Sequence, residues 1–273
     1  MSPTPPVVLV VAGSDSGGGA GVQADLRTLA AHGVFATTAI TAVTAQNTVG
    51  VDAVHVVPPE VVAAQMDAVL CDFTVGATKT GMLATAGIVE VVAQRASAAV
   101  LPNLVVDPVM VASSGDRLLA PEAEHAYVEL LFPHAAVITP NLREASVLVG
   151  REVASVADMG RAAEELGRTG AGMVVVKGGH RVGDEAVDVV WDGERLHELV
   201  GPRLASSNDH GTGCSLASAI AAGLARGDDL LATVYAAKAF VSRALEAATA
   251  WDLGGGRGPI DHFAGRGMTS VGQ

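Results

Sequence analysis

The chain has 273 residues, 49% of them hydrophobic, and a formal net charge of −12 at pH 7. This length is enough for one large α/β domain, and the acidic excess argues against nucleic acid or an anionic membrane surface as a partner. Two widely separated cysteines, Cys71 and Cys214, form neither a disulfide framework nor a zinc-binding spacing. Because no signal-like run or membrane-spanning stretch is present, the sequence predicts a cytoplasmic protein.

Short apolar runs alternate with segments of helical periodicity along the chain. In chain order, the patterns predict a strand at 7–13, a helix at 22–33, strands at 34–44 and 51–57, a helix at 58–73, a strand at 75–81, a helix at 86–98, a strand at 103–110, a helix at 120–132, a strand at 135–141, helices at 142–150 and 156–170, a strand at 173–179, a hairpin at 185–201, and helices from Gly213 and across 230–249. Such alternation predicts a mostly parallel sheet with helices on both faces, in a single domain covering residues 1–273.

Polar and glycine-rich segments follow several of the predicted strands. They lie at residues 13–21, 79–82, 107–110, 139–144 and 177–180. In open α/β sheets, ligands bind beyond the carboxyl ends of the strands, so we expect these segments to form one site. The polar loop at 113–117 also follows a strand, and we expect it to act as a lid over that site.

The stretch from His210 to Cys214 reads His-Gly-Thr-Gly-Cys and opens a helix. Helix N-termini expose unpaired N–H groups and a partial positive charge, and glycines let the backbone approach a phosphate closely. A tight turn before a packed helix explains the motif equally well when it is taken alone. The neighbouring polar residues Asn208 and Asp209 favour an anion site.

Three further residues have both a structural and a functional interpretation. Asn141 and Glu144 lie three apart at a predicted helix start, where they form an ordinary capping box or bind Mg²⁺ and phosphate through oxygen ligands. Asp107 ends a strand as a candidate metal ligand or as a solvated turn residue.

The chain has only three lysines among its 17 basic residues, namely Lys79, Lys177 and Lys238. This scarcity indicates that lysine is kept for positions where a compact ammonium group is needed. Lys177 ends a predicted strand, and we expect it to reach the ligand site. A surface lysine lying along the fold is the alternative.

Gly19 to Ala24 fit the loose G-x-G-x-x-A form of a dinucleotide-binding fingerprint. That fingerprint also requires an acidic residue at the end of the second strand, and no acid follows here until Asp52. No Walker A run is present either. We therefore interpret the glycine-rich segment as a loop that closes over a small substrate. It is a poorer match to the dinucleotide-binding loop of a nicotinamide oxidoreductase.

Taken together, the motifs resemble one family. The stretches that carry it follow one another along the chain, and the resemblance extends over residues 7–263. They are "GSDSGGGAGVQADLRT", "ITAVTAQNTVGV", "KTGML", "DPVMVASSGDRLL", "ITPNLREA", "VKGGH", "HGTGCSLASAIAAGLARG" and "GPIDHF". They resemble the hydroxymethylpyrimidine/phosphomethylpyrimidine kinases of thiamine biosynthesis, in the ribokinase-like superfamily. The resemblance implies a three-layer α/β/α sandwich with a mostly parallel central sheet, a homodimer, ATP and Mg²⁺, and phosphorylation of the hydroxymethyl group and then of its phosphate.

The resemblance also implies roles for individual residues. In the pyrimidine site, Gln46 would read the amino group and ring nitrogen, beside Gly13, Asp25, Met82 and Val109. Asp107 and Glu144 would hold Mg²⁺ partly through water. The nucleotide would be bound by Asn141, Glu144, Lys177, Thr212 and Lys238, and the catalytic set would be Lys177, Cys214 and the anion hole of Gly211 and Gly213.

Two positions of this family pattern raise questions. Cys214 stands where sugar kinases of the superfamily have a basic aspartate, and we expect the helix N-terminus to lower its thiol pKa so that it orients the substrate hydroxyl and takes its proton late. Asp209 stands where the family has threonine, and its role is open. A pyridoxal or pyridoxine kinase, or a catalytically weak pyrimidine-binding regulator, is the alternative function.

Overall fold

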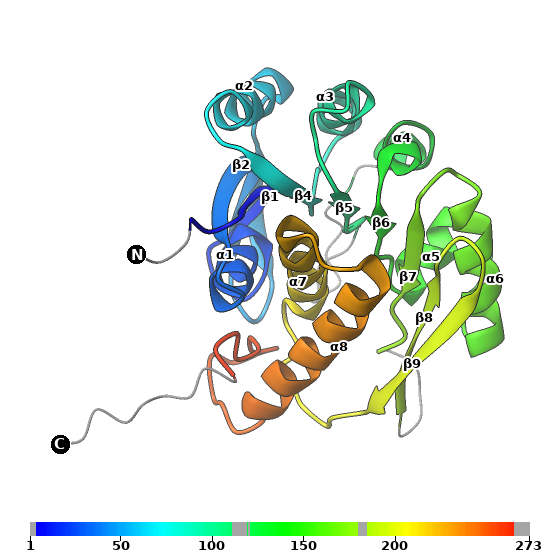
Figure 1. Cartoon of the computed structure of the whole chain (residues 1–273). Helices are drawn as coiled ribbons and strands as arrows, with labels where there is room; N and C mark the ends of the chain where they lie inside the picture. The colour runs from blue at the N-terminus through cyan, green and yellow to red at the C-terminus, as the bar shows by residue number, and fades with distance from the viewer. Residues whose placement is uncertain (1–3, 111–118, 120, 180–184, 265–273) are drawn as a thin grey trace.

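The structure, a computed structural model, describes residues 4–110, 119, 121–179 and 185–264. Within these ranges nine strands form one sheet, in the order β3-β2-β1-β4-β5-β6-β7-β8-β9 (Figure 1). The strands are β1 (Val7–Asp15), β2 (Phe35–Gln46), β3 (Val51–Val56), β4 (Val75–Thr80), β5 (Leu104–Val106), β6 (Val137–Ile138), β7 (Met173–Val176), β8 (Glu185–Trp191) and β9 (Leu196–Pro202).

Helices alternate with the strands as the patterns predict, and two of the described helices follow the last strand. They are α1 (Gly21–Ala31), α2 (Pro59–Leu70), α3 (Ala86–Ser97), α4 (Pro121–Ala126), α5 (Leu142–Leu148), α6 (Val156–Gly167), α7 (Thr212–Arg226) and α8 (Leu230–Ala247). Most predicted elements agree with the observed ones to within a few residues. This agreement reflects strong apolar periodicity and clear glycine and proline boundaries.

The predicted helix at 120–132 differs in helix type from the observed structure. The α-helix ends at Ala126 and is followed by a π-helical turn (Tyr127–Leu131) and a 3₁₀ turn (Phe132–His134). Pro133 lies in this last turn and has no N–H to donate, so a regular helix cannot continue through it.

Strand pairing confirms a mostly parallel sheet. β1 lies parallel to β2 and β4, and β4, β5, β6 and β7 continue as parallel neighbours. The edge strand β3 and the β8–β9 hairpin are antiparallel. Parallel strands bring their carboxyl ends to one edge, where the polar segments of the sequence gather.

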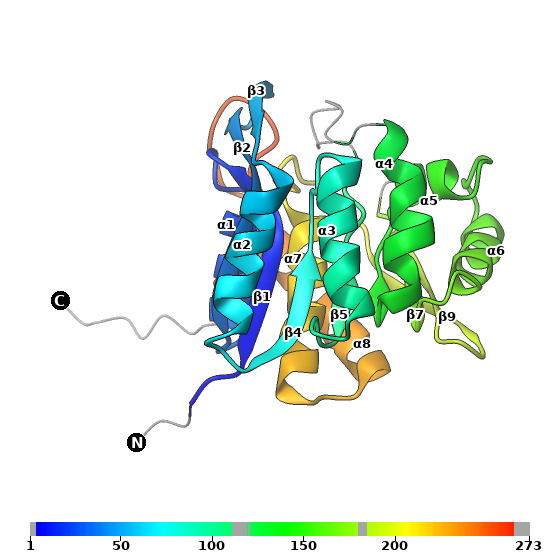
Figure 2. The same cartoon turned by 90° about the horizontal axis from the view of Figure 1, so that it is seen from above.

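Helices cover both faces of the sheet. The strands are apolar on both sides, since Leu9 and Val11 of β1 pack into one hydrophobic cluster while Val8 and Val10 pack into the other. The first cluster includes side chains from α2, α3 and α6, and the second includes side chains from α1, α7 and α8. Figures 1 and 2 show these two helical layers on opposite sides of the strands, which confirms the three-layer α/β/α architecture.

The lid predicted at 113–117 and the position of His180 lie outside the described residues. Among the helices that are described, none has the length and apolar character needed to cross a bilayer.

Candidate active site

A cavity of about 280 Å³ lies at the carboxyl ends of the central strands. Its walls bring together nearly all the predicted site residues, from segments far apart in the sequence. They are Gly13, Gln46, Met82, Asp107, Val109, Asn141, Glu144, Lys177, Gly211, Thr212, Gly213, Cys214 and Lys238. Asp25 is the exception and does not line the cavity.

The N-terminus of α7 forms one wall. Gly211 precedes the helix with a φ of +84°, a left-handed conformation that strongly favours glycine. A Cβ atom at this position would also overlap the carbonyl oxygen of Gly19, so the loop that ends β1 and the loop that opens α7 are in direct contact. The free N–H groups of α7 therefore face a cavity, as an anion-binding helix start requires.

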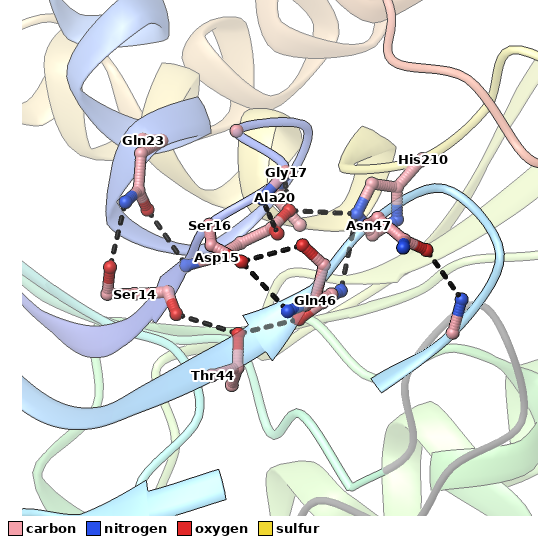
Figure 3. A network of polar contacts seen from close by, with 12 residues as sticks. Ser14, Asp15, Ser16, Gly17, Ala20, Gln23, Thr44, Gln46, Asn47 and His210 are labelled. Atoms are coloured by element: carbon pink, nitrogen blue, oxygen red, sulfur yellow. Dashed lines mark hydrogen bonds and ion pairs between the residues drawn. The ribbon is translucent and has the colours of Figure 1, made fainter. Parts of the chain in front are cut away.

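Asp15, at the end of β1, links these two loops (Figure 3). Its carboxylate accepts hydrogen bonds from the backbone N–H groups of Gly17 and Ala20, both at 2.8 Å, and lies 3.0 Å from Nε2 of His210. Burial works to raise the pKa of Asp15, but these hydrogen bonds hold it below its ordinary value. Asp15 was not among the individual site residues predicted from the sequence.

Gln46 ends β2 beside this network (Figure 3). Its backbone N–H and C=O both bond to the Ser16 hydroxyl, at 2.8 and 2.6 Å. Its side-chain amide lies 3.1 Å from the Thr44 hydroxyl and 3.5 Å from Nε2 of His210. Ser16 thus fixes the backbone of Gln46, while Thr44 and His210 hold its side-chain amide at the cavity wall.

Lys177 and Asp107 form an ion pair next to the α7 N-terminus. The Nζ–Oδ1 distance is 2.7 Å, and the Thr139 hydroxyl donates to the same oxygen at 3.0 Å. A Cβ atom on Gly213 would lie 3.1 Å from the Lys177 ammonium, so glycine there allows the lysine close to the helix start. Burial works to lower the pKa of Lys177, but Asp107 and Glu144 raise it above its usual value, and the lysine is charged.

Asn141 and Glu144 form the capping box that the sequence allows. The Asn141 side chain accepts from the backbone of Arg143 and Glu144, and a Glu144 carboxylate oxygen accepts from the Asn141 N–H at 2.7 Å. Both residues also line the cavity, so the structural and the functional interpretations are compatible. Burial, with Asp107 nearby, raises the pKa of the Glu144 carboxyl to about 7.

The prediction that the helix N-terminus lowers the pKa of Cys214 is wrong. Burial raises the pKa of its thiol to about 11, and the backbone N–H of Gly21 and the Lys79 ammonium only partly offset this. Asp25 and Asp107 add to the rise, because nearby negative charge disfavours a thiolate. Cys214 is therefore a neutral thiol near pH 7.

Asp25 lies below the cavity wall, fully buried and engaged with protein groups. Lys79 donates to both of its carboxylate oxygens at 2.8 Å, and the Ser218 hydroxyl donates to one of them at 2.8 Å. Neither the Lys79 nor the Asp25 side chain is exposed. This arrangement differs from the expectation that Asp25 lines the pocket, because the carboxylate compensates a buried ammonium instead.

All three lysines of the chain border the cavity, and each is paired with an aspartate. Besides the two pairs above, Lys238 of α8 bonds to Asp188 of β8 at 2.6 Å, and Asp188 also accepts from the Gly178 N–H at 2.8 Å. The scarcity of lysine in the sequence therefore correctly indicated residues of the site. It did not indicate that each lysine is paired with an aspartate.

Asp209 also lines the cavity, and Arg257 from the C-terminal segment is its partner. Arg257 Nε donates to Oδ1 at 2.8 Å, and Nη2 contacts Oδ2. Arg257 was not predicted as a site residue, because a single arginine in the irregular "GGGRGPIDHF" stretch has no distinguishing local pattern.

Comparison with known proteins identifies relatives along nearly the whole chain. A model of the family described as phosphomethylpyrimidine kinase matches residues 15–261. A hydroxymethylpyrimidine/phosphomethylpyrimidine kinase of Rhizobium meliloti is 52% identical over 258 residues, covering 94% of this chain and 97% of that protein. A thiamine biosynthetic bifunctional enzyme of Arabidopsis thaliana is 50% identical over 95% of this chain, which spans half of that enzyme.

A solved structure shows that the fold is shared with a known kinase. An ADP complex of Bacillus subtilis pyridoxal kinase superimposes with a TM-score of 0.89 and 38% sequence identity, covering 96% of this chain and 99% of that one.

Proposed function

The chain belongs to the phosphomethylpyrimidine kinase family, and we propose that its cavity carries out both phosphoryl transfers of that family at one site. The names of its relatives show a pyrimidine kinase of thiamine biosynthesis. The ADP complex of the similar pyridoxal kinase supports ATP as the phosphoryl donor. The observation that carries the one-site proposal is the shared cavity. It places a primary amide, a thiol, a glycine-rich helix N-terminus and a lysine around one space.

We assign recognition of the pyrimidine to Gln46. A primary amide offers one acceptor and two donors, which matches an amino group beside a ring nitrogen. Gly13, Met82 and Val109 lie on the same cavity wall and offer apolar contact to the ring. The Thr44 and His210 contacts hold the side-chain amide, and Ser16 holds the Gln46 backbone, before substrate arrives, which lowers the entropy lost on binding.

Another part of the cavity suits a nucleotide. It is lined by apolar side chains of β9, α7 and α8, including Leu216, Val241 and Leu245, with Lys238 beside them. These surfaces fit an adenine ring. The α7 N-terminus and Lys177 would then lie against the phosphates, where they neutralise charge that develops during transfer.

The residues present fit a bound Mg²⁺. Asp107 and Glu144 both face Lys177, and both carboxyl groups line the cavity. Burial, with Asp107 nearby, raises the pKa of Glu144, and a bound cation would favour its ionised form. In the described part of the chain no three acidic, histidine or cysteine side chains cluster as a metal site, so phosphate and water oxygens would complete the coordination. When bound, the ion would neutralise charge on the phosphate oxygens.

We propose that Cys214 orients the substrate hydroxyl as a neutral thiol. The hydroxyl oxygen forms a bond to the γ-phosphorus as the bond to the ADP oxygen breaks, and its proton then leaves to solvent. A loose transition state of this kind needs orientation more than a strong base. The late proton transfer to a Cys214 thiolate, expected from sequence, does not fit a thiol whose pKa is about 11.

Substitution of Cys214 tests this role. Cys214→Ala should lower kcat by about 10- to 100-fold with little change in the KM of the alcohol, because positioning is lost and binding is kept. Cys214→Ser, which retains a hydrogen-bonding group, should recover most of the rate. Undiminished turnover of the alanine variant at saturating substrate would rule out the role.

Counting transferred phosphates by mass tests the proposed function directly. With the pyrimidine alcohol and excess ATP, the monophosphate should form first and the diphosphate second. Accumulation of the monophosphate alone would show that the cavity performs one transfer only. ATP and pyrimidine binding without any ADP release would instead support a pyrimidine-binding regulator.

A second candidate activity is phosphorylation of pyridoxal or pyridoxine. It is favoured by the likeness to a pyridoxal kinase along nearly the whole chain. Comparing kcat/KM for the pyrimidine and pyridoxal alcohols under identical conditions distinguishes the two.

We also propose a homodimer. The β2–β3 edge exposes Val43, Val49 and Val54, which are 50%, 69% and 43% exposed. Light scattering on the purified protein would measure the mass. A cytoplasmic location stays a prediction, which cell fractionation would check.

A further inference from the structure

Asp209 places a carboxylate on the wall of a cavity that must admit anions. It lies two residues before Gly211, and its backbone carbonyl accepts from the N–H of Thr212, in the same turn that opens α7. Its side chain is 26% exposed, so water screens it only in part. A bare carboxylate here would oppose the positive field of the helix N-terminus.

Arg257 neutralises this carboxylate from outside the cavity. Its Nε and Nη2 atoms contact the two oxygens of Asp209, an arrangement that suits the planar guanidinium fork. Arg257 is not among the residues lining the cavity. The wall therefore presents Asp209 with its charge compensated from behind.

The backbone around Arg257 sets the position of this guanidinium. The Arg257 N–H donates to the carbonyl of Thr48, in the loop after Gln46, at 2.9 Å. Next to it, the Gly258 N–H donates to Ser207 at 3.1 Å, and its carbonyl accepts from His210 at 3.0 Å. The arginine is thus anchored between the β2–β3 loop and the segment that leads into α7.

The two acceptors of the proposed reactions differ in charge. The alcohol is neutral, whereas its monophosphate carries about −1.5 to −2 charges near pH 7. An uncompensated Asp209 would repel the second acceptor and leave the first nearly unaffected. We propose that the Asp209–Arg257 pair is a specificity-determining element that lets this cavity accept the phosphorylated substrate of the second transfer. The inference rests on the proposed function.

A purely structural pair would behave differently. If Arg257 only anchored the C-terminal segment, its loss would displace the cavity wall for both acceptors. The ratio of kcat/KM for the monophosphate to kcat/KM for the alcohol separates the two roles. This ratio also cancels changes in ATP binding, because ATP is common to both reactions.

The test compares this ratio in the full-length protein and four variants. Arg257→Gln should lower the ratio about tenfold, since one carboxylate is left uncompensated near a dianion. Arg257→Lys, which keeps the positive charge, should lower the ratio much less. Asp209→Asn should leave the ratio at or above the wild-type value, and Arg257→Gln/Asp209→Asn should restore it. The loss in Arg257→Gln should also shrink as salt is raised.

A matched control is Arg151→Ala, which leaves the carboxylate of Glu165 without its arginine partner on the surface, where neither residue lines the cavity. Its ratio should equal that of the wild type. An unchanged ratio in Arg257→Gln, or no recovery in the double variant, would overturn the inference. Wild-type protein that phosphorylates neither acceptor would contradict the proposed function instead, so the two failures are distinguishable.

Discussion

At Cys214, the effect of burial on the thiol pKa outweighs the effect of the helix N-terminus. The dipole at a helix start contributes about 0.3–1 kcal/mol, which corresponds to less than one pKa unit. Burial, together with the nearby Asp25 and Asp107 charges, moves the thiol pKa from 9.0 to about 11 despite Lys79. The sequence shows the helix start but not the aspartates, which explains why the direction of the pKa shift was predicted wrongly.

Alkylation would reveal this raised pKa. At pH 7.5, iodoacetamide should modify the exposed Cys71 well before Cys214, because the thiolate is the reactive form. Peptide mass spectrometry over time gives both rates in one sample. In a Cys71→Ser control, modification of Cys214 should stay slow and quicken as the pH rises toward 11. Preferential labelling of Cys214 at pH 7.5 would contradict the shift.

At the scale of elements, the buried Lys79–Asp25 pair joins three parts of the fold. Lys79 belongs to β4, Asp25 to α1, and Ser218, which donates to the same carboxylate, to α7. These elements are the ones that carry the cavity floor and the α7 N-terminus. A buried charge pair of this kind fixes position more than it adds stability, because both charges are removed from water.

Breaking this pair should destabilise the protein strongly. Lys79→Met leaves a buried carboxylate uncompensated and should lower the free energy of unfolding by about 3–5 kcal/mol. Lys79→Met/Asp25→Leu should recover most of that loss. Arg151→Met, which breaks the surface pair with Glu165, should cost about 1 kcal/mol or less. Urea unfolding measures all three, and similar losses in Lys79→Met and Arg151→Met would show that the buried pair behaves like a surface pair.

Element type and order were largely predictable, because apolar periodicity is a local property. The ends of some elements were not. The predicted strand at 103–110 is observed only over Leu104–Val106. The Asp107 side chain bonds to Thr139 and Lys177 instead. Pro108 has no N–H group to donate to a neighbouring strand. Such endings depend on partners from distant segments.

At the scale of the whole molecule, the site residues found by sequence lie in recognisable motifs, and those missed act through long-range pairs. Asp15 and His210 are 195 positions apart, and Asp209 and Arg257 are 48 apart. No periodicity links such positions, so the sequence motifs predicted the cavity wall but not the charges that support it. The capping box of Asn141 and Glu144 was visible because it is local.

Global stability should fall in mild acid because of His262. This residue is 3% exposed, contacts the Ser215 hydroxyl at 3.0 Å, and burial lowers its pKa to about 4 from 6.5. Between pH 6.5 and 4 the unfolded chain binds a proton that the folded chain does not. The free energy of unfolding should therefore drop by about 3 kcal/mol as pH falls through this window.

Urea unfolding at pH 7.5 and pH 4.5 checks this dependence. His262→Gln, which can still accept a hydrogen bond from Ser215, should lose less stability between the two pH values than the wild type. Equal losses in the two proteins would show that other groups dominate acid sensitivity.

The anchoring of Arg257 also has a consequence for synthesis on the ribosome. The nine-stranded sheet is complete at Pro202, and α7 and α8 at Ala247, whereas the contacts of Arg257 and His262 come later in the chain. Because chains emerge N-terminal end first, the sheet and helices can assemble before Asp209 acquires its partner. A nascent or prematurely terminated chain would then resemble the finished protein in shape, yet discriminate against the phosphorylated acceptor. Activity toward the phosphorylated acceptor would thereby report that translation had passed Arg257.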